Sequence, residues 1–224
     1  PESALGAELV GWRSGLRADL ILESLNVIFA GRRRDFESVG LGYVSFTPPP
    51  GNHDRALLEA ASSILRLLGL QRRYPGRKDK AMDTAPAAVR DYAGRAASTA
   101  GFAPSEPFEL LAAAGVIRDY VIQPDQLRIM PIQEQAWRCI ACRNLHLHPS
   151  AGVCANCLAE LPDDPEPFTP AKDYYGYLAT EAGEPFRLHA EELTGQTDWD
   201  DAQRRQAEFQ GIFLEKGSQI PTVD

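Results

Sequence analysis

The spacing of apolar residues predicts the elements at the start of the chain. Between residues 14 and 31 the apolar side chains recur at nearly helical intervals, and Gly31 stands where a helix commonly ends. Residues 36–46 carry apolar side chains around two glycines and are typical of a strand. The run Pro48-Pro49-Pro50-Gly51 is a stiff break in the chain, so we expect a boundary there.

Three further helices are predicted from cap residues and helical spacing, at residues 52–69, 84–92 and 105–115. Residues 116–122 and 127–130 flank Pro124-Asp125 and are expected to pair as a β-hairpin. Three helices followed by a hairpin is the order of a winged-helix module. We therefore interpret residues 51–132 as a winged-helix-like region.

The last quarter of the chain follows an acidic, proline-rich joint at residues 162–167. A helix is expected at residues 173–180, and a strand at 187–193 leads into the polar turn Thr194-Gly195-Gln196-Thr197. A helix at 201–213 and an apolar strand at 220–223 come next. Strand, turn, helix and strand in this order are typical of an α/β unit in a doubly wound sheet.

Four cysteines are the strongest chemical signal in the sequence. They form two C-x-x-C pairs, Cys139 with Cys142 and Cys154 with Cys157, and eleven residues separate the pairs. Two such pairs can place four thiolates at the corners of a tetrahedron, which is the geometry of a structural zinc site. The residues between the pairs alternate as a strand does and then turn back, so we predict a zinc ribbon at residues 133–162.

Two disulfides or four free thiols are the alternatives to zinc. These are the only cysteines, and no charged-then-apolar leader precedes them, which favours a reducing cytoplasm where such thiols usually bind metal. His146 and His148 could replace a cysteine, but both project from one strand face, and we expect them to be surface or partner-contact residues. Loss of the metal is expected to unfold the ribbon while the flanking helices stay folded.

Length and composition bound the class of protein. A chain of 224 residues can form one large or two small domains. No apolar run approaches the length of a membrane span, so no membrane partner is expected. The chain begins at Pro1 without a methionine, and we expect it to be a piece of a longer protein.

The net charge of −8 is unevenly distributed. Between residues 156 and 201 there are twelve acidic side chains and two basic ones, a local charge of −10 that leaves +2 for the remainder. The locally basic stretches could contact phosphates, although a charge run is more often a solvated face. These stretches are Arg32-Arg33-Arg34 and the set Arg72, Arg73, Arg77, Lys78 and Lys80.

Two stretches of the sequence resemble a known family. Residues 187–198, followed by Arg204-Arg205-Gln206 and Phe209-Gln210-Gly211-Ile212, look like the start of the second RecA-like domain in superfamily 2 helicases. Trp137-Arg138-Cys139 and residues 146–158 are similar to the zinc ribbon that precedes this domain in the very large DEAD/DEAH-box helicases of bacterial anti-phage defence islands, such as Druantia. The resemblance implies a middle segment of an ATP-dependent nucleic-acid helicase or translocase. DNA is the expected nucleic acid, and other proteins of a defence complex are possible partners.

The resemblance also implies candidate contacts with nucleic acid. In the family, the turn Thr194-Gly195-Gln196-Thr197 lies on the face that grips the strand, where a hydroxyl and a backbone N–H can bind a phosphate. The same turn could equally well cap the following helix. We add Arg72, Arg73 and Arg77 to the candidates because they could neutralise phosphates.

The chain lacks motifs that a helicase motor needs. It has neither a Gly-rich P-loop ending in Gly-Lys-Ser/Thr nor a D-E-x-H/D box. ATP and Mg²⁺ are therefore expected only in the longer protein, and this segment should be inactive alone. Zinc catalysis is disfavoured because four thiolates leave no open metal position and no H-x-E motif stands beside the cysteines.

A rival interpretation is a zinc-ribbon and winged-helix module without motor activity, which docks a partner protein or binds nucleic acid. The acidic stretch favours a protein partner because acidic surface repels DNA. For either function the sequence predicts an α+β chain of four parts. These are a helix-plus-strand segment at 1–50, the winged-helix-like region at 51–132, the zinc ribbon at 133–162 and the start of a RecA-like domain at 163–224.

Overall fold

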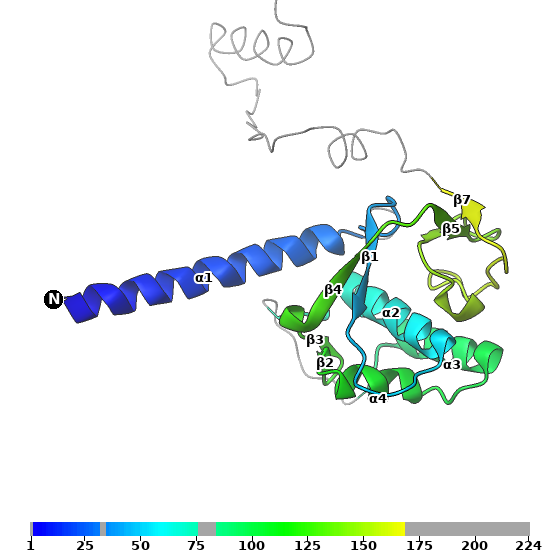
Figure 1. The fold of residues 1–224 in the computed structure, drawn as a ribbon, viewed down its shortest axis with the longest axis horizontal. Helices are drawn as coiled ribbons and strands as arrows, with labels where there is room; N and C mark the ends of the chain where they lie inside the picture. The colour runs from blue at the N-terminus through cyan, green and yellow to red at the C-terminus, as the bar shows by residue number, and fades with distance from the viewer. Residues whose placement is uncertain (1, 32–34, 76–83, 169–224) are drawn as a thin grey trace, which may run out of the picture. The chain divides into compact units, whose positions relative to one another are not determined.

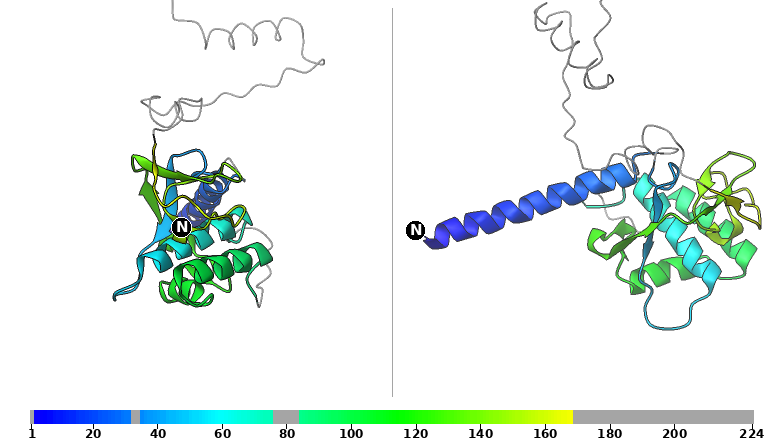
Figure 2. Two further views of the ribbon diagram at one scale, coloured as in Figure 1. Left: turned by 90° about the vertical axis from the view of Figure 1, so that its right-hand side faces the viewer. Right: turned by 45° about the horizontal axis from the view of Figure 1, so that its top comes forward.

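A computed structural model describes residues 2–31, 35–75 and 84–168 (Figures 1 and 2). The chain divides into two compact units, Pro1–Ala182 and Gly183–Asp224, and every described residue belongs to the first. The elements expected beyond residue 168, including the turn at residues 194–197, lie outside the described residues.

Four α-helices and three small antiparallel sheets make up the described residues, which confirms the predicted α+β class. The helices are α1 (Glu2–Ile28), α2 (Arg55–Leu70), α3 (Ala87–Ala100) and α4 (Glu106–Ala113). The strands are β1 (Gly42–Phe46), β2 (Ile117–Arg118), β3 (Val121–Ile122), β4 (Leu127–Pro131), β5 (Gln135–Arg138), β6 (Leu145–His146) and β7 (Glu166–Pro167). Two 3₁₀ turns are η1 (Pro124–Gln126) and η2 (Ser150–Gly152). None of the helices in this part of the chain combines the length and the apolarity needed to cross a membrane.

The helices predicted between residues 52 and 115 are confirmed. The carboxylate of Asp54 accepts a hydrogen bond of 2.7 Å from the Ala56 N–H and caps α2, as its position before the apolar run predicts. Helix α3 follows Pro86 and ends at Gly101, whose φ of 83° is the left-handed conformation of a glycine cap. Helix α1 begins much earlier than residue 14 and ends at Ile28, before the glycine expected to close it.

The hairpin predicted between residues 116–122 and 127–130 is wrong. Strand β2 pairs instead with β3 across the two-residue turn Asp119-Tyr120, in which both residues have positive φ. Strand β4 pairs with β1 in antiparallel register, with Val44 opposite Ile129. The residues Pro124-Asp125 form the turn η1 between β3 and β4 and not the tip of a hairpin. Of the strand predicted at 36–46, only the second half is a strand.

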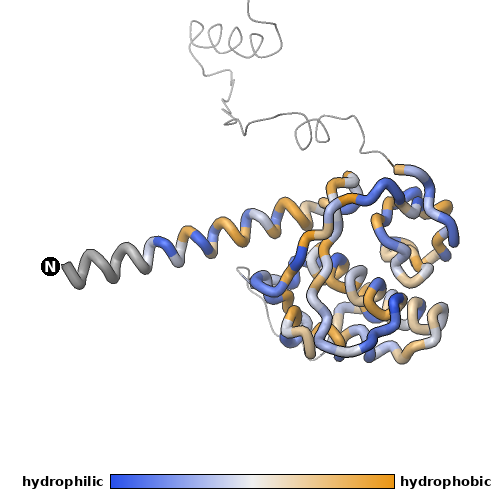
Figure 3. The backbone as a smooth tube through the Cα atoms, viewed as in Figure 1, coloured by the Kyte–Doolittle hydropathy of each residue, from blue (hydrophilic) through white to orange (hydrophobic). Residues whose placement is uncertain are grey.

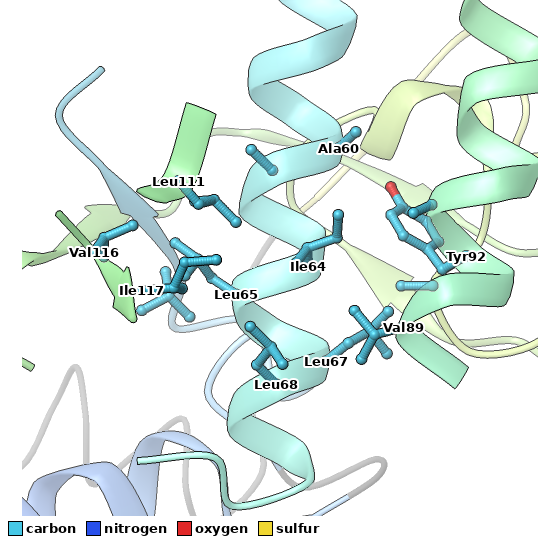
Figure 4. Packing of buried hydrophobic residues seen from close by; sticks show 14 of the residues in the cluster. Ala60, Ile64, Leu65, Leu67, Leu68, Val89, Tyr92, Leu111, Val116 and Ile117 are labelled. Carbon is cyan, nitrogen blue, oxygen red and sulfur yellow. The ribbon is translucent and has the colours of Figure 1, made fainter. Parts of the chain in front are cut away.

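Helix α2 lies at the centre of the main hydrophobic core. Figure 4 shows its apolar side chains between two sets of neighbours, one from α3 and one from α4 and β2. Val89 and Tyr92 pack from α3, while Leu111 and Ile117 pack from the other side. Because α2 is covered on both sides, every residue from Ala60 to Gly69 is buried, including the polar Ser62, Ser63 and Arg66.

Residues on both sides of α2 in the sequence join the same core. Leu25 of α1 and Phe29, the residue after α1, enter it, and Ala151, Val153 and Ala155 enter it from the cysteine-rich region. The core therefore crosses residues 50 and 132, where boundaries between the first three parts of the chain are expected from the sequence. The helical region and the cysteine-rich region share one hydrophobic interior.

Helix α1 contributes only its last turns to this core. Figure 3 shows apolar residues alternating with polar ones along the described part of the helix. Trp12 and Leu20 are 65% and 59% exposed, whereas Phe29 is 1% exposed. The contact between α1 and α2 is thus concentrated at the C-terminal end of α1.

That contact depends on a glycine in α2. A Cβ atom at Gly69 would lie 2.3 Å from two ring carbons of Phe29, far closer than atoms in a packed core can approach. We expect Gly69→Ala to lower the free energy of unfolding by about 1–3 kcal/mol, because the buried ring must move. Chemical denaturation measures this loss.

Gly94 in the middle of α3 is the matched control, because a Cβ atom there would meet no atom within 4 Å. Gly94→Ala should raise the free energy of unfolding by up to about 1 kcal/mol, the gain in helix propensity. An equal gain for Gly69→Ala would show that the ring of Phe29 does not pack against this glycine.

Candidate metal centre

The two C-x-x-C pairs form turns with the same backbone hydrogen bonds. In the first turn, residues 139–144, the Arg143 N–H donates to the Cys139 carbonyl and the Cys139 N–H donates to the Asn144 carbonyl. The second turn, residues 154–159, repeats both bonds, from Leu158 to Cys154 and from Cys154 to Ala159. We call these turns the first and second knuckle. Their equivalence shows that each pair is shaped by its own local chain.

A left-handed residue closes each knuckle just after its second cysteine. Arg143 has a φ of 61° and Leu158 a φ of 64°, although neither is glycine. Such a conformation costs free energy for a residue with a side chain, and it is commonly found at functional positions. Here it lets the backbone N–H two residues after the second cysteine point at its sulfur, from Asn144 to Cys142 and from Ala159 to Cys157.

The knuckles bring all four cysteine sulfurs together. The four Sγ atoms lie within 4.8 Å of one another, with Cys139 and Cys157 3.5 Å apart and Cys142 and Cys154 3.6 Å apart. With a zinc–sulfur distance of about 2.3 Å, a regular tetrahedron has sulfur–sulfur edges of about 3.8 Å. The sulfurs are too far apart for a disulfide, whose bond is about 2.05 Å long, and all four cysteines are free. The predicted metal site, Cys139, Cys142, Cys154 and Cys157, thus has the dimensions of a zinc site.

The thiols differ in burial and in acidity. The first cysteine of each knuckle is buried, whereas Cys142 is partly exposed and Cys157 is exposed. Burial acts to raise the pKa of Cys142, but hydrogen bonds from the Asn156 side chain and the Asn144 backbone lower it to about 6. Burial raises the pKa of Cys154 and of Cys157. A divalent cation is therefore the partner that would let all four sulfurs ionise together.

A buried arginine joins α2 to the chain around the knuckles. The Arg66 guanidinium, 3% exposed, makes a bidentate ion pair with Asp35, at 2.7 Å and 3.1 Å. Its Nη1 lies 3.0 Å from Glu37 Oε2 and donates to the Leu145 carbonyl at 3.3 Å. Burial would lower the pKa of Arg66, but Glu37 and Asp35 more than offset this and raise it.

Glu37 connects the same arginine to β6. Its Oε1 accepts a hydrogen bond of 3.0 Å from the Leu147 N–H. Burial raises the pKa of Glu37 to about 7, although Arg66 and the Leu147 N–H both act to lower it. The chain just after α1 and the chain just after the first knuckle are thereby bound to one side chain of α2.

The burial of His146 and His148 contradicts what the sequence predicts. Both were expected at the surface or against a partner, yet both are buried, with His146 completely inaccessible. They do share one strand face, because each ring has a nitrogen about 4 Å from Glu37 Oε1. That face points inward, since β6 lies against the buried charges of α2 and the segment after α1. Burial lowers the pKa of His148 to about 4 and the pKa of His146 well below its usual value, so both rings are neutral.

Hydroxyl groups bind the turn η2 to the helices. Ser150 Oγ lies 2.6 Å from Ser63 Oγ and 2.9 Å from the Tyr92 hydroxyl, which also donates to the Ser150 carbonyl. The Ala151 N–H donates to Glu59 at 3.3 Å. Buried polar groups are costly unless they are paired, so these bonds fix the approach of the cysteine-rich region to α2 and α3.

The candidate nucleic-acid contacts are described only in part. Arg72 is exposed at the C-terminal end of α2, with a φ of 57°. Arg73 is half-buried, and its carbonyl accepts a hydrogen bond of 2.8 Å from the Ile122 N–H. Arg77 and the turn at residues 194–197 lie outside the described residues.

The sequence did not predict the buried ion pairs of Asp35, Glu37 and Arg66. One signal was available, because Arg66 interrupts the apolar run Ile64-Leu65-Arg66-Leu67-Leu68 of a buried helix. A charge at such a position needs a buried counter-charge. Nothing local marks Asp35 and Glu37 as the partners.

The buried ion pairs should dominate the stability of this junction. Removing the cation in Arg66→Met leaves two buried carboxylates without a counter-charge, so we expect the free energy of unfolding to fall by about 3–5 kcal/mol. Arg95, whose ion pair with Glu160 also joins a helix to the cysteine-rich region, is the control, since both of its partners are exposed. Arg95→Met should cost less than about 1 kcal/mol. Equal losses in denaturant titrations would contradict the role assigned to Arg66.

No family model matches the chain, and neither a curated protein nor a solved structure is similar enough to match it.

Proposed function

We propose that this chain is a structural zinc module that forms a segment of an ATP-dependent nucleic-acid helicase or translocase. The observation that carries the first part is the convergence of four cysteine sulfurs within 4.8 Å. Four thiolates complete the coordination of zinc and leave no position for a substrate, so the metal would be structural and not catalytic.

The position of the site supports a structural role as well. The cysteine-rich region contributes Ala151, Val153 and Ala155 to the main core, and Arg66 binds both sides of the junction. Such a metal would hold the predicted zinc ribbon in the shape that packs on α2 and α3. The metal would keep the cysteine-rich region folded, because this small region has few apolar residues of its own.

The helicase part of the proposal rests on sequence motifs. Trp137-Arg138-Cys139 and residues 146–158 resemble the ribbon of the defence helicases, and residues 187–198 resemble the start of their second RecA-like domain. The order α2, α3, α4 and the β2–β3 hairpin is compatible with a winged-helix-like region. On this proposal the longer protein binds ATP and Mg²⁺, works in the cytoplasm in phage defence, and moves along DNA.

A second candidate function is a docking module for a partner protein. The local charge of −10 between residues 156 and 201 favours it, because an acidic surface repels nucleic acid. Binding to nucleic acid separates the two candidates.

Zinc content is the first test. The purified chain should carry about one zinc ion, and Cys154→Ser should lower this content. Because the ribbon shares its core with α2 and α3, we expect chelation to lower the melting temperature of the helices too, in contrast to the local unfolding expected from the sequence. Zinc at a thousandfold excess over its Kd would contribute about 4 kcal/mol to unfolding.

Elemental analysis and thermal melts followed by far-ultraviolet circular dichroism check both outcomes. Cys154→Ser is the control, because its melt should not respond to a chelator. A chain that contains no metal, or iron in a coloured cluster, would refute the zinc proposal. A helical melt that a chelator leaves unchanged would restrict the role of the metal to the ribbon.

Weak, salt-sensitive binding of single-stranded DNA is the second expectation. Affinity should fall steeply with salt because neutralised phosphates release counterions. Arg72→Glu combined with Arg77→Glu should weaken binding equally for all sequences, and Thr194→Ala should cost only about 1 kcal/mol. Fluorescence anisotropy at several salt concentrations measures these effects.

Arg13→Glu on α1 is the control for the arginine variants, because Arg13 is exposed and not among the candidate contacts. It should change affinity less than the changes at Arg72 and Arg77. No binding by the wild-type chain at low salt would favour the docking module.

A further inference from the structure

His146 lies between the cysteine sulfurs and the buried charges of the helical region. Its Nε2 is 3.3 Å from Cys154 Sγ, and its Nδ1 is 3.9 Å from Glu37 Oε1. The ring is completely buried, and Nδ1 has no hydrogen-bond partner in the described part of the chain. No other histidine in the described residues forms a hydrogen bond with one of the four cysteines.

The sulfur chemistry decides which ring nitrogen carries the proton. A cysteine that binds zinc has lost its own proton, so Cys154 Sγ could only accept a hydrogen bond. A neutral imidazole has one N–H, and only the Nε2–H tautomer can donate to this sulfur. The other tautomer would bury the Nδ1–H without an acceptor in range, since 3.9 Å is too long for a hydrogen bond.

Asn144 is the competing partner of the same nitrogen. Its Nδ2 lies 3.4 Å from His146 Nε2, and an amide N–H in this position would donate to a bare Nε2. The oxygen and nitrogen of an amide side chain have almost the same shape. With the amide turned over, its oxygen faces the Nε2–H, and the ring then donates to the sulfur and to Asn144 together.

The ring is fixed from both sides along the strand. The carbonyl of Leu145, the residue before it, accepts a hydrogen bond from Arg66. The N–H of Leu147, the residue after it, donates to Glu37. His146 is also paired with Trp137 of β5 in the sheet. The orientation of the ring therefore depends on α2, through the same ion pairs that hold the junction together.

We propose that His146 is a positioning residue of the zinc site, which donates its Nε2–H to the Cys154 thiolate and ties that ligand to the buried Arg66–Glu37 pair. The proposal rests on the zinc site proposed above. Through His146, the helical region would hold the metal ligand Cys154 in place. Removal of such an outer partner lowers metal affinity by about 10- to 100-fold.

The tautomer of the wild-type protein gives a test without mutation. In the zinc-loaded 224-residue chain labelled with ¹⁵N, long-range ¹H–¹⁵N correlation spectra of the histidine rings distinguish a protonated from a bare nitrogen. We expect His146 to carry its proton on Nε2 alone. An Nδ1–H tautomer, or a ring protonated on both nitrogens, would overturn the proposal.

Cobalt titration of three variants tests the effect on the metal. Co²⁺ bound by four thiolates gives strong near-ultraviolet bands whose energy depends on the hydrogen bonds to sulfur. His146→Leu removes the donor and should weaken binding about 10- to 100-fold and shift these bands. His146→Gln can place an amide N–H near the position of Nε2 and should restore most of the affinity and of the band position.

His148→Leu is the matched control. His148 is a buried histidine of the same segment, and its Nδ1 accepts a hydrogen bond of 3.2 Å from the Ser150 N–H and none from a cysteine. This variant should lose stability but keep the wild-type bands. Equal losses of affinity in His146→Leu and His148→Leu would refute the positioning role.

The outcomes separate this inference from the zinc proposal. Suppose that the wild-type chain binds one Co²⁺ ion with thiolate bands, and that His146→Leu leaves both the bands and the affinity unchanged. This result would overturn only the role of His146. A wild-type chain that binds no Co²⁺ or zinc would refute the zinc proposal as well. If His146→Leu does not fold, the tautomer measurement and the cobalt titration of His146→Gln test the role of His146.

Discussion

The charge of Arg66 is the constraint on which the described structure depends. It stands in the middle of α2, a helix that is covered on both sides by apolar side chains. A buried guanidinium is tolerated only when its charge is paired and its N–H groups are bonded. Two carboxylates and one backbone carbonyl meet this need, from segments that are more than a hundred residues apart. Satisfying one side chain thus fixes where both segments lie on the helix.

The cysteine-rich region is folded by two different forces. At the sulfurs, paired knuckle turns and the charge of a divalent cation would hold four thiolates together. Away from the sulfurs, small apolar residues of η2 and the second knuckle pack into the core of α2 and α3. A ribbon on a linker could lose its metal without consequence for its neighbours. This one shares their interior, so the metal and the helices are linked through common contacts.

This linkage gives a physical meaning to the proposed structural zinc. A closed four-thiolate site performs no chemistry on a substrate, and its value lies in the shape that it maintains. In a moving nucleic-acid motor, a rigid junction of this kind would keep neighbouring parts in register. In a docking module, the same rigidity would present a fixed surface to a partner.

Local sequence alone determined the metal ligands and three of the helices. The spacing of Cys139, Cys142, Cys154 and Cys157 is sufficient because each knuckle is closed by hydrogen bonds within six residues. Caps such as Asp54 and the glycine at the end of α3 act on neighbouring residues in the same way. In each case the interaction that shapes the chain is visible in a short window of sequence.

The tertiary structure decided the strand pairing and the buried polar residues. Strand β4 pairs with β1, more than eighty residues away, and the true hairpin turn, Asp119-Tyr120, lacks the glycine that usually marks such turns. His146 alternates along its strand as a surface residue would, and only the inward approach of β6 to α2 buries it. In the sequence, Asp35 and Glu37 likewise look like solvated acids, and only the fold pairs them with Arg66. Pairing partners and burial depend on contacts between distant segments, and no short stretch of sequence contains both sides of such a contact.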